Sequence, residues 1–520
     1  MTKYSLLLLI CFLLLVGCNY PGGQEPQSDL SVDHLRQTLA ANSLPTELST
    51  AIIEPTQTTT PVNNEVEIIP TSSMTSISPL PTTILEGNEQ ELRYRVHSGD
   101  TLKALASRFD VEPAQIRSDT PIPAEGFITL GQELIIPNQF MGFISLPPVL
   151  PDSEVVNSPT AAGFNTRTYL SGANGYLSSY RAKVGDLNLT GADIVELVSQ
   201  EASINPVLLL ALLEFRSGLV FGQPRDASVF KYPLGFNVLG WEGLHKELVI
   251  AATHLNTGYY GWREGRTTEI VFRDGKKERI NPEMNAGSVA VQTLMGKLYS
   301  QQEWQQVLYG TEGLIETHQK MFGDPWARAK LVEPLFPDGV GQPAIEFPFG
   351  PGQRWSLTGG PHASWKTGSP RGALDIAPVT GEADCSVSYQ WVTAPAGGVI
   401  TRSLRNVVAL DLDGDGYEQT GWVIIFLHIA DQDRIQTGVF VNLDDPIGHP
   451  SCEGGTSTGT HVHIARKFNG EWIAAYGPLP MFLSGWEVQA GEKDYQGSLI
   501  KNGQSIIASP VGPRTSIIVR

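Results

Sequence analysis

The chain has 520 residues, 41% of them hydrophobic, and carries 54 acidic against 36 basic side chains, which gives a formal net charge of −18 at pH 7. A chain of this length predicts about three or four folded units rather than one. The excess of negative charge disfavours binding to nucleic-acid phosphates or to an anionic membrane surface, so we expect no nucleic-acid partner.

The first eighteen residues predict export. Lys3 is followed by an almost unbroken apolar run from Leu6 to Val16, which is too short to span a membrane. The box Leu15-Val16-Gly17-Cys18 closely resembles the bacterial lipoprotein signal. This resemblance implies that residues 1–18 are removed as a signal peptide and that Cys18 carries lipid. The protein would then be an extracytoplasmic lipoprotein, anchored to a membrane at the bacterial cell envelope. A plain secretory signal with an incidental cysteine is the alternative.

The four cysteines fit that compartment. Cys11 would leave with the signal peptide and Cys18 would be lipidated, which leaves Cys385 and Cys452. An isolated pair of cysteines in an exported protein predicts a disulfide. Residues 19–92 contain a long segment rich in Ser, Thr and Pro, and we interpret them as a disordered tether because they hold too little apolar surface to offset chain entropy.

Residues 93–138 combine a short strand pattern, a Gly99-Asp100-Thr101 turn that can cap a helix, and a closing strand before Pro137. The opening Tyr94-Arg95-Val96-His97-Ser98-Gly99-Asp100-Thr101-Leu102 and the ending Leu130-Gly131-Gln132-Glu133-Leu134-Ile135-Ile136-Pro137 resemble a LysM peptidoglycan-binding module. The resemblance implies binding of N-acetylglucosamine-containing glycan through the loops next to Gly99–Thr101 and beyond the second helix. Residues 139–160 read as a linker.

Residues 161–340 predict a mainly helical domain. Helix-compatible apolar spacing is present in five segments, which are Ala192–Ala202, Pro206–Phe215, Gly243–Leu255, Met284–Tyr299 and Gln301–Phe322. The runs Ile204-Asn205-Pro206-Val207-Leu208-Leu209-Leu210-Ala211-Leu212-Leu213 and Asn256-Thr257-Gly258-Tyr259-Tyr260 resemble the lysozyme-like transglycosylase fold.

That fold usually places its catalytic acid directly before a Ser-Gly pair, where this chain has Arg216. An arginine stays protonated and cannot deliver a proton to a glycosidic oxygen. Two hypotheses follow. Either the register is shifted and Glu214 is the acid, which would make the protein a hydrolase of glycan as well as peptide, or the domain only binds or spaces.

The C-terminal part, residues 345–490, contains histidines in informative settings. Gly359-Gly360-Pro361-His362 is followed by Ala373-Leu374-Asp375, the strand pattern Trp422–Leu427 ends at His428, and Gly459-Thr460-His461-Val462-His463-Ile464 alternates. Side chains alternate between the faces of a strand, so both imidazoles share one face while the apolar pair anchors the other. Two histidines, one carboxylate and an open position are what a catalytic zinc site requires.

Together these motifs resemble the lysostaphin/LytM-type zinc endopeptidases, and most closely their β-lytic subgroup. The resemblance implies that His362, Asp375 and His463 bind Zn²⁺ and that His428 and His461 are the catalytic pair. In the commoner form of that family a histidine stands four residues before the aspartate, and this chain has Arg371 there. Residues 491–520 are expected to be a C-terminal β extension.

The acidic run Asp411-Leu412-Asp413-Gly414-Asp415-Gly416 has the beginning of a calcium loop, but Trp422 stands where a ligating Glu would be needed. We therefore interpret it as the solvated tip of a hairpin.

The sequence thus predicts a multidomain α+β protein. It would contain a small α/β LysM module, a mainly α lysozyme-like middle domain and an all-β C-terminal peptidase domain. The expected function is hydrolysis of amide bonds in the stem peptides or cross-bridges of peptidoglycan, with Zn²⁺ as cofactor, peptidoglycan as partner and the N-terminal lipid in the membrane. The alternative is a non-catalytic wall-binding scaffold built on a degenerate peptidase.

Overall fold

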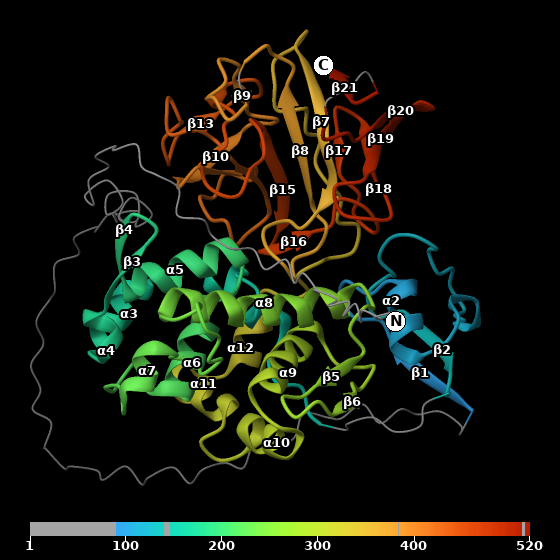
Figure 1. Ribbon diagram of the computed structural model, residues 1–520. Helices are drawn as coiled ribbons and strands as arrows, with labels where there is room; N and C mark the ends of the chain where they lie inside the picture. The colour runs from blue at the N-terminus through green and yellow to red at the C-terminus, as the bar shows by residue number, and fades with distance from the viewer. Residues whose placement is uncertain (1–89, 140–145, 383, 512–514) are drawn as a thin grey trace, which may run out of the picture.

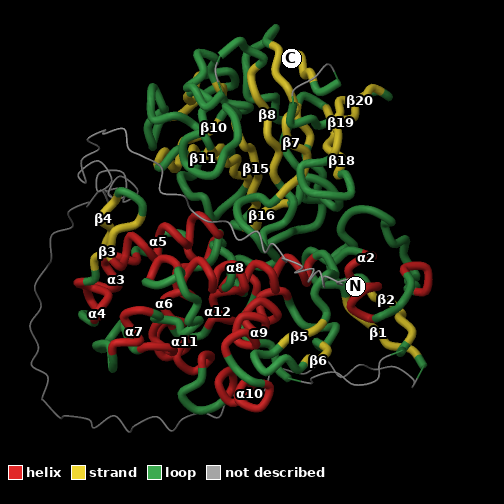
Figure 2. The backbone as a smooth tube through the Cα atoms, in the orientation of Figure 1, coloured by secondary structure: helices red, strands yellow, loops and turns green. Residues whose placement is uncertain are grey.

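The computed structural model describes residues 90–139, 146–382, 384–511 and 515–520 (Figure 1). Within them a small N-terminal module, a helical domain and a β-sheet domain pack against one another, with helices gathered in the middle domain and long strands in the last (Figure 2). Cys18, the predicted signal peptide and almost all of the predicted tether lie outside the described residues. No helix in the described part of the chain is both long and apolar enough to cross a membrane.

The N-terminal module follows its predicted order, with one difference. Its elements are β1 (Glu91–Arg95), α2 (Leu102–Phe109), a 3₁₀ turn (Pro113–Gln115) and β2 (Glu133–Pro137). β1 and β2 pair antiparallel. The Thr101 hydroxyl accepts a hydrogen bond from the backbone N–H of Ala104 at 3.2 Å, so the Gly-Asp-Thr turn caps α2 as expected. A single 3₁₀ turn stands where a second helix was expected.

The helical domain contains ten helices and two small hairpins in its described residues. They are α3 (Thr166–Ala173), α4 (Tyr176–Ser179), β3 (Arg181–Val184), β4 (Leu187–Thr190), α5 (Gly191–Ala202), α6 (Pro206–Ser217), α7 (Ala227–Lys231), α8 (Leu244–Arg263), β5 (Glu269–Val271), β6 (Lys277–Arg279), α9 (Ala286–Leu298), α10 (Gln301–Tyr309), α11 (Leu314–Phe322) and α12 (Pro325–Ala329). The mainly helical prediction agrees with this content.

Two segments of the helical domain differ from the sequence predictions. The helix expected over Gln301–Phe322 is two helices, because Gly310 and Gly313 fall within four residues and glycine is costly inside a helix. Part of the expected linker is packed rather than free, since Val149, Val155 and Val156 are at most 1% exposed in the core of the helical domain.

The C-terminal domain is built on a nine-stranded antiparallel sheet. Its strands run in the order β13 (Phe440–Val441), β10 (Gly398–Leu404), β11 (Val407–Asp411), β12 (Trp422–Leu427), β15 (Val462–Phe468), β8 (Ala373–Pro378), β7 (Arg354–His362) and β21 (Ile517–Val519), while β16 (Glu471–Ile473) pairs with β15. A short pair lies beside this sheet, formed by β9 (Val392–Thr393) and β14 (Pro446–Gly448). The all-β prediction for this domain therefore agrees with the structure.

The last strands are part of the same domain rather than an appendage. A four-stranded sheet joins β17 (Phe482–Leu483), β18 (Trp486–Ala490), β19 (Gly497–Lys501) and β20 (Gln504–Ile507). β21 returns to pair with β7, the strand that ends in His362. The segment predicted as a C-terminal extension thus contributes two strands, β19 and β20, to the four-stranded sheet and one, β21, to the edge of the main sheet.

The two faces of the main sheet bury different cores. On β15, Val462 and Ile464 point into the core of the β domain itself, and both are fully buried. Ala465 on the opposite face joins Val423 and Ile425 in the core of the helical domain. The same face of the sheet therefore carries His461 and His463 and, further along the strands, residues that pack against the helical domain.

One buried arginine links all three units. Arg263, at the end of α8, donates hydrogen bonds to the backbone carbonyl of Ser98 in the N-terminal module, to Asp152 of the helical domain at 2.9 Å and to Glu471 on β16 at 2.7 Å. The Glu471 carboxylate also accepts from the Tyr259 hydroxyl at 2.5 Å. A buried cation needs such partners to offset its lost hydration, so these contacts fix the three units relative to one another.

Candidate metal centre

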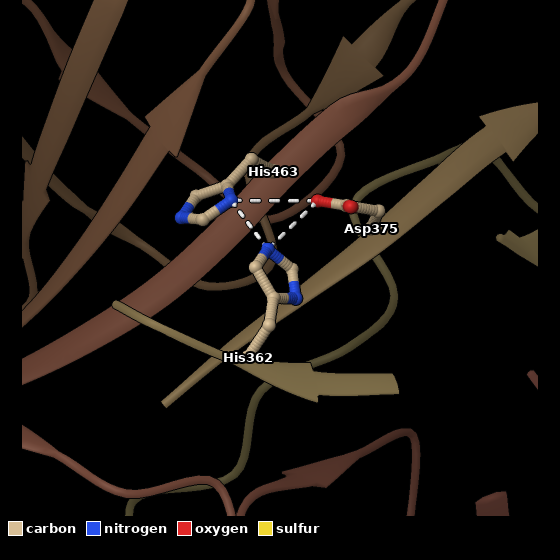
Figure 3. Close-up of side chains that lie close together, drawn as sticks. All are labelled: His362, Asp375 and His463. Atoms are coloured by element: carbon tan, nitrogen blue, oxygen red, sulfur yellow. Dashed lines mark hydrogen bonds and ion pairs between the residues drawn. The ribbon is translucent and has the colours of Figure 1, made fainter. Parts of the chain in front are cut away.

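Three side chains from neighbouring strands of the C-terminal sheet converge (Figure 3). His362 Nε2 lies 3.1 Å from His463 Nδ1, and Asp375 Oδ1 lies 3.4 Å from each of these two nitrogens. The ligands implied by the resemblance are the same three residues, His362, Asp375 and His463. The structure brings them together from positions that are far apart in the sequence.

The sheet topology explains this convergence. His362 is the last residue of β7, Asp375 lies on β8 and His463 lies on β15, and these three strands are neighbours in the sheet. His463 stands directly opposite Asp375 in the β15–β8 register. Because both residues of such a pair point to the same face, their side chains meet above the sheet.

Backbone carbonyls determine which nitrogen of each histidine faces the centre. His362 Nδ1 lies 2.9 Å from the Gly360 carbonyl oxygen, and His463 Nε2 lies 3.0 Å from that of Ser364. A carbonyl only accepts, so these nitrogens carry the protons and donate. His362 Nε2 and His463 Nδ1 are then left with lone pairs that face each other, an arrangement that favours a cation between them.

The carboxylate supports the same conclusion. Asp375 Oδ1 is buried, and in the described part of the chain no donor is hydrogen-bonded to it. Burial alone would raise the pKa of Asp375, but a proton on the facing nitrogens of the His362 and His463 imidazoles, in the place that a metal cation would take, holds it well below its ordinary value, so the group is an anion. Ligands about 2.0–2.2 Å from a tetrahedral zinc stand roughly 3.3–3.6 Å apart. The two distances to Asp375 Oδ1, 3.4 Å each, lie in this range, and the 3.1 Å between the two nitrogens is slightly shorter. The donor set therefore fits Zn²⁺.

His428 and His461 form a second pair beside this triangle. Their ring centroids are 4.5 Å apart, and His461 Nε2 lies 3.6 Å from Asp375 Oδ1. His428 Nδ1 donates to the Glu453 carbonyl at 2.8 Å, and His461 Nδ1 donates to that of Gly459 at 2.8 Å. Burial, together with the neighbouring His461, lowers the pKa of His428 to about 4. Both rings thus keep an Nε2 that can accept a proton.

Arg371 and His449 are two further polar residues of this domain, and their contacts lie outside the triangle. Arg371 pairs with Asp494 at 2.9 Å and donates to the Gly491 carbonyl at 3.1 Å. His449 donates from Nδ1 to the Gln390 carbonyl at 2.9 Å. His449 belongs to no group of ligand atoms close enough to share a metal among the described residues.

Sequence reasoning missed Tyr495. Its ring stacks on His362 with centroids 4.2 Å apart, and it stands on the turn between β18 and β19. Arg371 holds that turn through Asp494 and Gly491. No local motif marks Tyr495, because its position depends on the pairing of the last strands with the main sheet.

The loop after His362 also contacts the helical domain. Lys366 forms an ion pair with Glu201 of α5 at 3.5 Å, and the Trp365 ring stacks on Trp472 of β16 with centroids 6.3 Å apart. Ser364, whose carbonyl orients His463, belongs to this loop. The helical domain therefore helps to fix one wall of the site.

Two further expectations concern the C-terminal domain. Cys385 and Cys452 form the predicted disulfide, with Cα atoms 5.0 Å apart. β11 and β12 pair antiparallel around the acidic run, which is the predicted hairpin. Asp411, Asp413 and Asp415 gather at its tip, where Asp411 Oδ2 accepts from the Gly416 backbone N–H at 2.8 Å. These contacts are those of a hairpin turn.

Glu214, the residue weighed as an acid of the helical domain, caps a loop. Its Oε2 accepts hydrogen bonds from the backbone N–H groups of Val220 at 2.9 Å and Phe221 at 3.1 Å. The neighbouring Arg216 donates to the Leu234 carbonyl at 2.8 Å and to the Tyr299 hydroxyl. The contacts of both residues are structural.

We expect Glu214→Ala to lower the free energy of unfolding by about 1–2 kcal/mol, because two backbone donors lose their acceptor. Glu214→Gln keeps an amide oxygen and should lose less, which urea denaturation can measure. Reducing-end release from wall glycan should be the same for Glu214→Gln and the wild type. A stable Gln variant that loses such a release would instead make Glu214 an acid.

The sheet, the two-histidine and carboxylate triangle and the adjacent imidazole pair define a candidate catalytic zinc site with an open position. Comparisons with known proteins agree with this class. Residues 148–335 match the family model of the LasA N-terminal domain, and residues 94–137 match the LysM domain, which confirms the LysM prediction. The resemblance of the middle domain to lysozyme-like folds stays a prediction.

Individual relatives cover parts of the chain. It is 28% identical to Protease LasA of Pseudomonas aeruginosa over 300 residues, which is 53% of this chain and 66% of LasA. It is 29% identical to the Beta-lytic metalloendopeptidase of Achromobacter lyticus over 174 residues, 31% of this chain and 43% of that protein. A solved structure of the M23 metalloprotease pseudoalterin, from the deep sea, shows 23% identity over 32% of this chain and 96% of its own, with a TM-score of 0.28. The chain is therefore similar in sequence to proteins that are named as a protease and as a metalloendopeptidase, and it spans less than two thirds of the length of each.

Proposed function

We propose that this protein is a zinc endopeptidase that hydrolyses amide bonds in the stem peptides or cross-bridges of bacterial peptidoglycan. The observation that carries the proposal is the triangle of His362, Asp375 and His463, whose two lone pairs and one anionic oxygen face a common point at zinc-like spacing. The relatives named as a protease and as metalloendopeptidases support the reaction class. The LysM match supports the wall as the place of action.

In this proposal three residues bind the metal and two others transfer protons. His362, Asp375 and His463 would hold Zn²⁺, which would polarise a peptide carbonyl and lower the pKa of a bound water. The free Nε2 atoms of His428 and His461 accept the proton of the attacking water and return it to the leaving amide nitrogen. The carbonyls of Glu453 and Gly459 keep both rings in the tautomer that this transfer needs.

The remaining parts would bring the site to its substrate. The LysM module would hold glycan, and a lipid on Cys18 would hold the chain at a membrane of the cell envelope. Such tethering raises the effective concentration of a catalytic site on an insoluble polymer without any new contact at the site.

The test measures zinc content and the appearance of new amino groups when the protein, with residues 1–18 removed, is incubated with purified peptidoglycan. We expect about one zinc per chain and steady release of amino groups, lost on chelation and restored by added Zn²⁺. A protein that holds its zinc yet releases no amino groups from peptidoglycan would contradict the proposal and favour the wall-binding scaffold.

A further inference from the structure

A large cavity lies between the LysM module and the helical domain, away from the metal centre. Its volume is about 950 Å³, within the range of small-molecule and oligomer sites. Ser98 and Asp100 line it from the LysM module, which lies beside the helical domain in Figure 1. Glu283, Trp326 and Glu333 line it from the helical domain.

Contacts between the two units give this cavity fixed walls. The Ser98 hydroxyl donates to the Phe336 carbonyl at 3.1 Å and accepts from the Phe336 N–H at 3.0 Å. Arg108 donates to the Trp262 carbonyl at 3.0 Å, and its guanidinium lies 4.6 Å from the centre of that indole ring. These contacts hold the two domains together, so the shape of the cavity is fixed by the fold.

The charges of the walls disfavour anionic ligands. Five acidic side chains face three basic ones, namely Asp100, Asp152, Glu283, Asp324 and Glu333 against Arg108, Arg263 and Lys330. Arg108 is paired with Asp100 at 2.7 Å and Arg263 with Asp152 at 2.9 Å, so neither is available to an anion. Phosphate groups and nucleic acids do not fit such a lining.

Glu283 and Glu333 are two carboxyl groups of the cavity wall that take no part in these ion pairs. Within the described residues neither forms an ion pair, and Glu333 accepts one hydrogen bond, from the Ser153 backbone N–H at 2.9 Å. Burial raises the pKa of each to about 7, so near neutral pH each carboxyl can both donate and accept hydrogen bonds. Hydroxyl and amide groups of a neutral ligand match this chemistry.

Trp326 adds a flat apolar surface. It follows Asp324, which caps α12 by accepting from the Trp326 N–H at 2.9 Å, and its side chain is half-buried in the cavity wall. An aromatic face beside carboxyl and amide groups suits the alternating apolar and hydroxylated faces of a sugar ring.

We propose that this cavity binds a saccharide chain and that Trp326 and Glu283 of the helical domain contact sugars beyond those held by the LysM module. The proposal rests on the proposed action at the cell wall, and it gives the glycan a groove shared by two domains. The helical domain would then bind glycan in addition to supporting the C-terminal domain.

The test is calorimetric titration of the full chain with the β-1,4-linked tetramer of N-acetylglucosamine at neutral pH. We expect Trp326→Ala to weaken binding roughly tenfold, because one stacking contact is lost, and Trp326→Phe to restore most of it. Glu283→Ala is a second variant, which should disturb the fold less than Trp326→Ala does. It should also weaken binding severalfold. Trp241→Ala is the matched control, since Trp241 is 38% exposed in the same domain and does not line the cavity.

Two results would overturn the proposal. One is wild-type affinity in both Trp326→Ala and Glu283→Ala, which would leave the LysM loops as the whole glycan site. The other is the absence of tetramer binding by the wild type. Release of amino groups from peptidoglycan is measured in parallel, so a failed cavity with intact hydrolysis is distinguished from a failed peptidase with intact glycan binding.

Discussion

His463→Ala is expected to abolish both zinc retention and peptide release. His463 supplies one of the three ligand atoms, and its Nδ1 lone pair faces His362 Nε2 at 3.1 Å. Loss of groups that merely orient a zinc ligand costs about 10–100-fold in metal affinity, so loss of a ligand itself should cost at least about 100-fold. Zinc content after dialysis and amino-group release from peptidoglycan would measure the two effects.

His449→Ala is the matched control for this change. His449 is equally buried in the same domain, but its Nδ1 is bound to the Gln390 carbonyl and its ring lies 3.9 Å from that of Trp391. Zinc content should therefore stay at the wild-type level in this variant. Zinc retained at full stoichiometry in His463→Ala would remove His463 from the ligand set.

The second large effect is expected at His461, where catalysis and metal binding should separate. His461→Ala removes a proton acceptor beside the triangle but leaves its three ligand atoms, so zinc should remain while kcat falls by about 10²–10⁴-fold. His428→Ala should behave in the same way, because its Nε2 is also left free by the bond from Nδ1 to the Glu453 carbonyl.

The geometry makes the His461 experiment decisive. His461 Nε2 lies only 3.6 Å from Asp375 Oδ1, close to the 3.4 Å that separates His463 Nδ1 from the same oxygen. If His461→Ala lost zinc and His463→Ala kept it, the roles of the two histidines would be exchanged. Unchanged kcat in both His428→Ala and His461→Ala would contradict a catalytic pair.

Much of the metal centre could be predicted because it follows from strand periodicity. His461 and His463 alternate with Val462 and Ile464, and the two apolar residues are fully buried as that pattern requires. The Gly-Gly-Pro-His and Ala-Leu-Asp motifs lie on the two neighbouring strands of the sheet, β7 and β8, and supply the other two ligands. The site could be predicted because the local sequence pattern agrees with the register of the sheet.

Other features depend on contacts that no local pattern encodes. The nitrogen that each histidine presents is set by backbone carbonyls such as that of Ser364, in a loop held by the helical domain. Tyr495 reaches His362 only because the final strands fold back beside β7. Val155 is predicted from the sequence to lie in a linker, because a short apolar run does not show by itself which helices will cover it. In the structure it is buried in the core of the helical domain.

The Arg263 junction has a consequence for how the protein would work on a wall. The Arg263 guanidinium donates hydrogen bonds to Ser98 of the LysM module and to Glu471 of the C-terminal sheet, so it holds the two units at a fixed distance from each other. Under the proposed function, the distance from a glycan strand bound by the LysM module to the metal centre would be fixed by the folded protein. That fixed distance would determine which peptides along a strand come within reach of the centre.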